Sequence, residues 1–237
     1  MTTARSLYRR LRHAVQCALG RDVRFPVGTR VPMVRHGSEY GGWWICPNGI
    51  SADSVVYSFG IGTDISFDLS LIATYGLTVH AFDPTPASIA WLKAQQLPGP
   101  FKWQELGIAA YDGRATFFPP ADPTHVSHSV VPPVRSDRQG IDVEVRRLSS
   151  IMGSLGHEHV DVLKLDIEGA EYEVVDDILA GPVRPRQLLI EFHHRVAGIG
   201  IERTRRAVAG LEAAGYRIFS VSDTGEEYSF ILSTAPR

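Results

Sequence analysis

The chain has 237 residues, of which 44% are hydrophobic, and its formal charge at pH 7 is -2. A chain of this size can bury a full hydrophobic core, and its balanced charge gives no reason to expect a nucleic-acid partner. No apolar run approaches the roughly 20 residues that a membrane-spanning helix needs, and residues 1–25 lack the uninterrupted apolar segment of a secretory signal. We therefore expect a globular protein of the cytoplasm without stable membrane insertion.

The first segment predicts a basic amphipathic helix over residues 5–20. Leu7, Leu11 and Val15 recur at helical spacing, and four arginines lie at other positions of the same segment. Up to residue 35 the chain has eight arginines and one acidic residue, Asp22. Such a helix can bind a membrane surface or phosphate groups, or it can pack against the body of the protein or a partner subunit.

An aromatic strand is predicted over residues 40–46, behind the paired glycines Gly41 and Gly42. Its two tryptophans, Trp43 and Trp44, are adjacent in the chain. Large rings at such a position either form a wall against a ligand or pack in the core, and both interpretations are open at this point.

The next segment predicts a strand, a tight glycine turn and a helix. Val55–Phe59 is rich in β-branched and aromatic residues, and it leads directly into Gly60 and Gly62. A second apolar strand, Thr78–Phe82, ends in Asp83, 21 residues after Gly62, where a carboxylate would reach the hydroxyls of a ribose. The alternative is an ordinary turn that needs glycine only for its dihedral angles. The acid at this distance favours a nucleoside site.

A third strand is predicted over residues 101–106, after a helix for which Ser88 is the expected N-cap. In doubly wound sheets the ligand binds in a crevice at the carboxyl ends of the strands. By analogy, Gly107 and Ile108 would lie beside this crevice and flank the base of the nucleoside. Residues 119–140 contain five prolines without periodicity, and we expect them to form a lid or substrate loop.

The chain is expected to divide into a basic appendage over residues 1–30 and one main domain over residues 31–237. In the main domain, predicted strands alternate with predicted helices, and this pattern is typical of an α/β fold. Near its end, residues 216–221 and 228–233 predict two strands joined by a short turn, which makes an antiparallel edge hairpin on an otherwise parallel sheet. Both a monomer and a homodimer are compatible with these features.

The most distinctive sequence pattern of the chain lies at a second predicted junction between a strand and a helix. Val160–Leu165 has the apolar character of a central parallel strand, and Asp166 follows it at the carboxyl end. Glu168 and Glu171 fall at the beginning of the next helix, where the helix dipole alone already favours carboxylates. Asp166 is therefore expected to project into the crevice.

A further strand over residues 187–192 also ends in polar side chains. Glu191 lies near its end, and His193 and His194 follow it. A glutamate buried in a strand needs a partner, and a metal ion or a substrate proton would serve.

Four motifs together resemble one family of enzymes. They are Tyr57-Ser-Phe-Gly-Ile-Gly62, His80-Ala-Phe-Asp-Pro-Thr85, Leu163-Lys-Leu-Asp-Ile-Glu-Gly-Ala-Glu171 and Leu189-Ile-Glu-Phe192. This set resembles the FkbM-type S-adenosylmethionine-dependent methyltransferases, and the Gly41-Gly-Trp-Trp44 element resembles a branch that includes animal methyltransferase-like proteins. The likeness spans residues 34–232, and its KxDxEGxE pattern is specific, whereas a GxG alone would not be.

The resemblance implies a class I Rossmann-like fold with a mostly parallel seven-stranded sheet. It also implies methyl transfer from S-adenosylmethionine to a hydroxyl of a sugar, a polyketide or another small metabolite, and we favour a sugar. By position, Asp166 and Glu168 would face the reacting centre. The residues expected to contact the cofactor are Phe59, Gly60, Gly62, Ser66, Asp83, Gly107 and Ile108.

Methylation of an alcohol requires help at the acceptor, because a hydroxyl is a poor nucleophile at neutral pH. Asp166, Glu191 and His193 form an oxygen-rich set suited to Mg²⁺ or Mn²⁺, as in metal-dependent catechol-type methyltransferases. Glu168 or His194 is then the expected general base. The alternative is a hydrogen-bonded cluster of acids that orients cofactor and substrate without an ion.

Two other classes of function compete with this interpretation. A nicotinamide-dependent oxidoreductase shares the same strand-turn-helix site, but position 65, where the dinucleotide fingerprint has its third glycine, is Ile65. A non-catalytic docking module would use the basic N-terminal helix instead. The polar residues predicted at several strand ends count against the docking module, since buried acids without a partner are costly.

Overall fold

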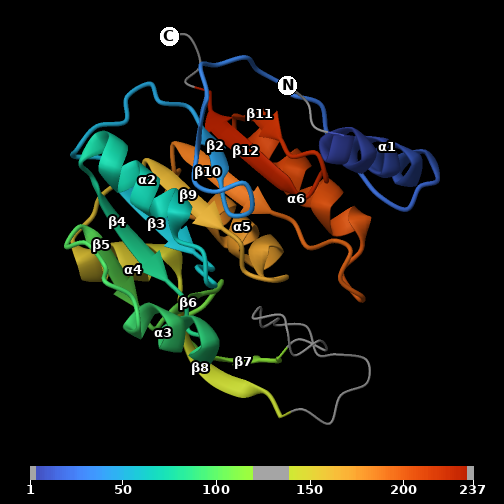
Figure 1. The fold of residues 1–237 in the computed structure, drawn as a ribbon. Helices are drawn as coiled ribbons and strands as arrows, with labels where there is room; N and C mark the ends of the chain where they lie inside the picture. Colours follow the sequence, from blue (N-terminus) through green and yellow to red (C-terminus); the bar gives the residue numbers. More distant parts are fainter. Residues whose placement is uncertain (1–3, 120–138, 234–237) are drawn as a thin grey trace.

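Figure 1 shows the computed structural model of the chain, which describes residues 4–119 and 139–233. The structure confirms an α/β fold built on one large, mostly parallel sheet. In order across this sheet, the strands are β11 (Tyr216–Val221), β12 (Glu227–Leu232), β10 (Gln187–Glu191), β9 (Val162–Leu165), β3 (Val55–Phe59), β4 (Thr78–Phe82) and β5 (Phe101–Gln104).

The directions of the strands bring the functional segments to one edge of the sheet. Strands β10, β9, β3, β4 and β5 run parallel to one another, so their carboxyl ends meet at the same edge. Strand β12 runs antiparallel both to β10 and to β11 and lies between them. The hairpin therefore places β11, and not β12, at the edge.

Alternation along the central strands separates two hydrophobic layers. Val56, Val162 and Leu189 belong to the layer beneath α2 (Ser66–Tyr75), whereas Tyr57 and Leu163 belong to the layer beneath the other helices. The helices of the second layer are α4 (Leu148–Leu155), α5 (Glu171–Ala180) and α6 (Ile201–Ala213). Because both faces of the sheet are covered, the central strands are apolar almost throughout.

Two small sheets complete the fold. Strands β1 (Val34–His36) and β2 (Trp43–Ile45) pair antiparallel over the α2 side, and the predicted strand over residues 40–46 is reduced to β2. The other small sheet has the order β6-β8-β7, with bounds Gly107–Ile108, Ile141–Arg146 and Gly113–Phe117.

The structure corrects two local predictions in this region. The strand predicted over residues 101–106 ends at Gln104, because the chain then leaves the main sheet and pairs β6 with β8. Helix α3 (Pro86–Lys93) begins two residues before Ser88, with Thr85 at the N-cap and a proline in the first turn. Ser88 is buried, and its hydroxyl oxygen lies 2.9 Å from Thr85 Oγ1, within hydrogen-bond distance.

The N-terminal helix, α1 (Ala4–Ala18), lies at the periphery beside α6 and the β11–β12 hairpin (Figure 1). The segment after it follows the edge of the sheet, where the backbone N–H of Gly28 donates to the carbonyl of Ile218 at 2.8 Å. None of the helices in the described part of the chain has the length and apolar character needed to cross a bilayer. Of the loop predicted as a lid, residues 120–138 lie outside the described residues.

Candidate active site

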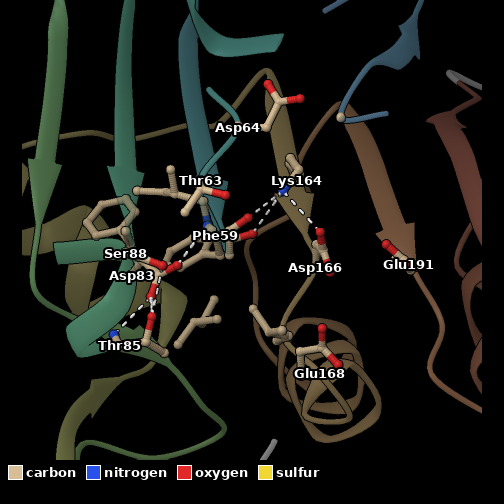
Figure 2. Close-up of a pocket in the computed structure, with 18 of the residues that line it drawn as sticks. Phe59, Thr63, Asp64, Asp83, Thr85, Ser88, Lys164, Asp166, Glu168 and Glu191 are labelled. Atoms are coloured by element: carbon tan, nitrogen blue, oxygen red, sulfur yellow. Dashed lines mark hydrogen bonds and ion pairs between the residues drawn. The ribbon is translucent and has the colours of Figure 1, made fainter. Parts of the chain in front are cut away.

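One cleft opens at the carboxyl edge of the main sheet, and most of the site residues predicted from the sequence line it. The predicted residues that line the cleft are Phe59, Gly60, Gly62, Asp83, Gly107, Ile108, Asp166, Glu168 and Glu191. Figure 2 shows Asp83, Thr85 and Ser88 on one side, and Asp166, Glu168 and Glu191 on the other. The β3 end, with Phe59, lies between these two groups.

Asp83 organises the glycine turn. Its Oδ2 accepts hydrogen bonds from the backbone N–H groups of Ile61 and Gly62, both at 3.0 Å. Its Oδ1 accepts from the N–H and the hydroxyl of Thr85 at 2.9 and 2.6 Å. These four bonds match the acceptor capacity of a carboxylate. In this structure, the acid that was expected to bind a ribose therefore uses its acceptor sites to hold the turn that would face the nucleoside.

Gly60 lets two strands approach closely at the floor of the cleft. Its φ is +75°, and a Cβ atom at this position would lie 1.6 Å from the carbonyl oxygen of Asp166. Beneath the turn, the buried ammonium of Lys164 donates to the carbonyls of Phe59 and Gly60 at 3.3 and 2.8 Å. The same ammonium lies 3.6 Å from Oδ2 of Asp166, so it links the glycine turn to the acidic side of the cleft.

The turn after β9 is held in an unusual conformation by a buried acid. Among the described residues, Glu168 is the only one other than glycine with a positive φ, 53°. Glu171 is fully buried, and its carboxylate accepts from the N–H groups of Ile167 and Gly169, both at 3.0 Å. Such strain persists only where the surroundings over-determine it, and it clusters at functional sites. Glu171 therefore has a structural role beyond the helix dipole.

His193 lies among three carboxylates. Its Nδ1 donates to Oε1 of Glu171 at 2.8 Å, and its Nε2 lies 3.4 Å from Glu168 and 3.9 Å from Asp166. Burial by itself lowers the pKa of His193, but the surrounding carboxylates, above all that of Glu171, raise it well above its usual value. The hydrogen bond to Glu171 fixes the orientation of the ring, so Nε2 faces the two acids of the cleft.

Asp166, Glu191 and His193 come together as the sequence predicted. One ligand atom from each lies within 4.8 Å of the others, which is close enough for a shared cation. The donor set of two carboxylates and one imidazole, with a carboxylate behind the imidazole, suits a divalent metal ion. The residues therefore fit the expected ion.

Two acids on neighbouring strands retain protons unusually strongly. Burial, reinforced by the negative charge of Asp166, raises the pKa of Glu191 to about 9. The same causes raise the pKa of Glu227, at the start of β12, to about 7. A divalent cation in this acidic pocket would favour the ionised forms and replace these protons.

This protonation predicts a pH-dependent stability in the absence of divalent ions. Because the folded pKa of Glu191 lies above the unfolded value of 4.5, the free energy of unfolding should decrease as the pH rises from 4.5 towards 9. In chelator, we expect the thermal midpoint to fall between about pH 6 and about pH 9, and to fall less for Glu191→Gln. Adding Mg²⁺ at the alkaline end should restore the midpoint of the wild type only. Parallel pH curves for the two proteins would contradict the assignment.

The structure corrects the expectations for His194 and Ser66. The imidazole of His194 turns away from the cleft, and its Nε2 donates to Oδ1 of Asp22 at 2.7 Å. Strand β10 has ended at Glu191, and in the turn that follows the two adjacent imidazoles bond to different acids, His193 to Glu171 and His194 to Asp22. Ser66 does not line the cleft; its hydroxyl accepts from the N–H of Ser38 at 2.7 Å and so tethers the start of α2.

Lys164 and Glu227 also line the cleft, and neither was among the predicted site residues. Trp43 lines it as well, which is one of the two interpretations left open for the tryptophan pair. Of the two tryptophans, Trp43 is buried and lines the cleft, and its ring centre lies 5.9 Å from the Lys164 ammonium, whereas Trp44 is exposed. A lysine inside an otherwise apolar strand was a signal for Lys164. No local signal distinguishes Glu227 from the preceding Glu226.

Comparisons with known proteins identify the family of the chain. The model of the Methyltransferase FkbM domain matches residues 54–218, which contain the glycine turn, Asp83 and the acids after β9 and β10. The chain belongs to the FkbM methyltransferase family. The match begins just before β3 and ends within β11. Helix α1 therefore lies outside the FkbM domain match.

The relatives extend beyond this chain. Human "Probable methyltransferase-like protein 24" is 29% identical over 188 residues, covering 74% of this chain and 45% of its own length. The rat protein of the same description is 29% identical over 175 residues, covering 69% of this chain and 42% of its own. The chain thus spans less than half the length of these relatives. A crystal structure of "Methyltransferase FkbM" from Methylobacillus flagellatus KT aligns with a TM-score of 0.47 and 14% identity, over 76% of this chain and 44% of that one.

Proposed function

We propose that the protein is an S-adenosylmethionine-dependent O-methyltransferase that acts on a hydroxyl of a small molecule, with a sugar or glycoside as the favoured acceptor. One observation carries the proposal: the glycine turn held by Asp83 opens onto the same cleft as Asp166, Glu168 and Glu191. A nucleoside-type site and a group of acids thus share one space. Membership of the FkbM family supports methyl transfer as the reaction.

The residues on the turn side of the cleft fit an adenosine-bearing cofactor. Phe82 and Ile108 provide apolar surface beside the glycine turn, where a base can be covered. The N–H groups of Ile61 and Gly62 are committed to Asp83, so these two donors do not point at a pyrophosphate. This arrangement suits S-adenosylmethionine better than a dinucleotide, and it favours the methyltransferase over the oxidoreductase.

On the acidic side, Glu168 is the proposed general base. S-adenosylmethionine supplies an electrophilic methyl group on a positively charged sulfur. The Glu168 carboxylate accepts the proton of the acceptor hydroxyl while the oxygen forms its bond to the methyl carbon. The carbon–sulfur bond breaks in the same step, and the sulfur leaves as the neutral thioether of S-adenosylhomocysteine. The strained turn positions this carboxylate, and Glu171 and His193 hold the turn in place. His194 is no longer a candidate, since it bonds to Asp22 outside the cleft.

Asp166, Glu191 and His193 are the proposed ligands of a divalent ion, Mg²⁺ or Mn²⁺. An ion held there would lower the pKa of an acceptor hydroxyl and so reduce the demand on the base. The alternative is that the same residues orient substrate as a protonated, hydrogen-bonded cluster. The pH experiment with Glu191→Gln distinguishes a bound ion from a protonated cluster without an activity assay.

The acceptor is proposed from the mouth of the cleft. The exposed ring of Tyr40 lies at the rim, close to the polar side chains of Asp64 and Glu168. An aromatic face beside polar groups suits a sugar ring, whose apolar and polar sides it can contact together. A polyketide hydroxyl is the alternative. An assay that follows transfer of a labelled methyl group from S-adenosylmethionine should compare sugar and polyketide acceptors.

The decisive experiment is a calorimetric titration of S-adenosylhomocysteine into the protein, with NAD as the control ligand. We expect the homocysteine compound to bind and NAD not to bind. Binding of NAD alone would overturn the proposal in favour of an oxidoreductase. Binding of neither ligand, with acceptor sugars present, would count against any nucleoside function of the cleft.

A further inference from the structure

The N-terminal helix presents its apolar side to the solvent. Leu7, Tyr8 and Leu11 are 64%, 66% and 64% exposed, and Val15 and Leu19 continue the same surface. At 100° per residue these five side chains fall within one arc of the helix. A helix that packs on a globular body normally turns this arc inward. We refer to the five residues as the apolar face of α1.

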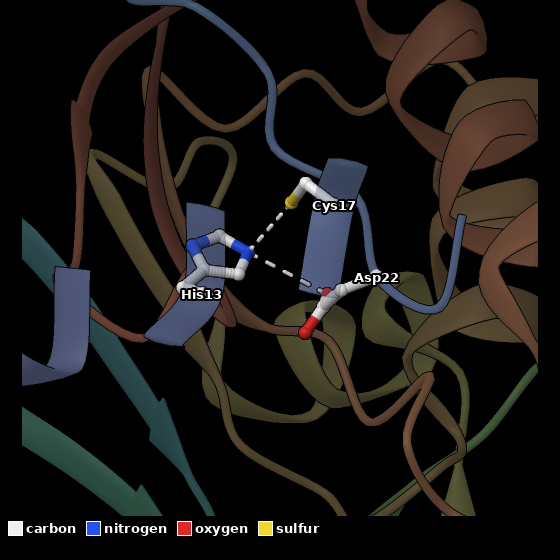
Figure 3. A group of neighbouring side chains, drawn as sticks. All are labelled: His13, Cys17 and Asp22. Carbon is white, nitrogen blue, oxygen red and sulfur yellow. Dashed lines mark hydrogen bonds and ion pairs between the residues drawn. The ribbon is translucent and has the colours of Figure 1, made fainter. Parts of the chain in front are cut away.

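Polar contacts hold the opposite side of α1 against the body. His13 is buried, its Nε2 donates to the carbonyl of Val23 at 3.2 Å, and the same atom lies 3.3 Å from the sulfur of Cys17. Figure 3 shows His13, Cys17 and Asp22 gathered at this contact. At the other end of the helix, Ser6 donates a hydrogen bond to Asp223.

Asp22 connects this contact to the rest of the protein. Its carboxylate accepts from Nε2 of His194 at 2.7 Å and from the guanidinium of Arg195 at 2.7 and 2.9 Å. Gly225 leaves just enough room for the imidazole, because a Cβ atom there would lie 1.8 Å from His13. These contacts fix the rotation of α1 about its axis, so the apolar face remains directed outward.

Basic side chains border the apolar face. Arg9, Arg12 and Arg21 line a surface hollow together with Gln16, and all three arginines are exposed. In the described part of the chain, none of the three guanidinium groups takes part in an ion pair or a hydrogen bond. The first acidic residue of the sequence is Asp22, so α1 itself carries no negative charge. The formal charges on α1 itself are therefore all positive.

We propose that α1 docks on the surface of a membrane that contains anionic phospholipids, with its apolar face in the interface and the arginines of the hollow on lipid phosphates. A helix with one apolar arc and a cationic border is the arrangement that lies in the plane of a bilayer interface. Pairing with a second copy through the same face would bring arginines towards arginines with no acid on either helix. Charge complementarity thus selects the anionic surface.

Vesicle sedimentation of the full chain tests this proposal. We expect co-sedimentation with phosphatidylcholine vesicles that contain phosphatidylserine, little with phosphatidylcholine alone, and release at high salt. Leu7→Asp with Leu11→Asp should abolish binding, and Arg9→Glu with Arg12→Glu should lower the partition coefficient by roughly tenfold or more. Tyr111→Asp and Lys102→Glu change exposed residues outside α1, and Lys102 lies on β5, at the opposite edge of the main sheet from β11. Both variants serve as matched controls and should bind like the wild type.

The contrary outcomes are distinct. Absence of binding to anionic vesicles at low salt overturns the proposal. A stable dimer that Leu11→Asp converts to a monomer, without vesicle binding, assigns the apolar face to a second copy instead. Circular dichroism and the thermal midpoint verify that each variant is folded, which is expected because Leu11 and Arg9 are exposed. The result does not depend on the proposed methyl transfer.

Discussion

Replacing Gly60 by alanine should destroy the cleft, whereas the same change at Gly62 should be tolerated. Both glycines have a positive φ, +75° and +56°, so alanine pays a similar conformational cost at each, about 1–2 kcal/mol. Only at Gly60 would the new methyl group collide with backbone, 1.6 Å from the Asp166 carbonyl; at Gly62 nothing lies within 4 Å. The collision separates β3 from β9, and we expect a loss of more than about 4 kcal/mol.

Urea unfolding of the two alanine variants measures this difference directly. Gly62→Ala should retain a cooperative transition and its affinity for S-adenosylhomocysteine, while Gly60→Ala should be unfolded or strongly destabilised. Because the chemical change and the sign of φ are the same, Gly62→Ala controls for strain alone. Equal losses in the two variants would show that strain, and not the contact with Asp166, explains the glycine at position 60.

Replacing Glu168 by glutamine should abolish most of the turnover while leaving the cofactor bound. The amide keeps the shape of the side chain but cannot accept a proton, and loss of a general base commonly lowers turnover by roughly 10²–10⁴. Steady-state rates and a titration with S-adenosylhomocysteine give the two readouts. If the binding is lost together with turnover, then Glu168 holds the fold of the cleft and another group takes the proton.

The positive φ of Glu168 predicts a separate effect on stability. Glu168→Gly and Glu168→Ala both remove the carboxylate, but only glycine adopts a φ of 53° without strain. We therefore expect both variants to be inactive, and the glycine variant to be more stable than the alanine variant by about 1 kcal/mol. Thermal or urea unfolding of the pair supplies the measurement. Equal stabilities would mean that the turn relaxes when the carboxylate is removed.

The local elements and the main site residues followed from the sequence because their signals are local. The bounds of the strand Val55–Phe59 and of Thr78–Phe82 agree with the structure to the residue. Alternating or continuous apolar residues, ended by glycine or by an acid, define such strands within a few positions. The carboxyl ends of parallel strands meet at one edge, so Asp83, Asp166 and Glu191 were placed together before any contact was known.

Side-chain direction at the ends of elements was not predictable in the same way. His193 and His194 are adjacent and chemically identical, yet one faces Glu168 and the other bonds to Asp22, 172 residues away in the chain. Similarly, Asp83 was expected to serve a ligand, and its bonds to Ile61 and Gly62 appear only when β3 and β4 are paired. Such choices depend on which groups the folded chain brings within hydrogen-bonding distance.

For the N-terminal helix, the sequence determined the two faces and the tertiary contacts determined their orientation. Periodicity established an apolar and a basic face over residues 5–20, together with the position of each side chain around the axis. The periodicity does not determine which face contacts the body of the protein. An apolar face is usually buried, but in this structure the apolar face of α1 is exposed. Contacts of His13 and Asp22 with distant residues decide it. A buried acid must be paired, and satisfying Asp22 turns the apolar face of α1 outward.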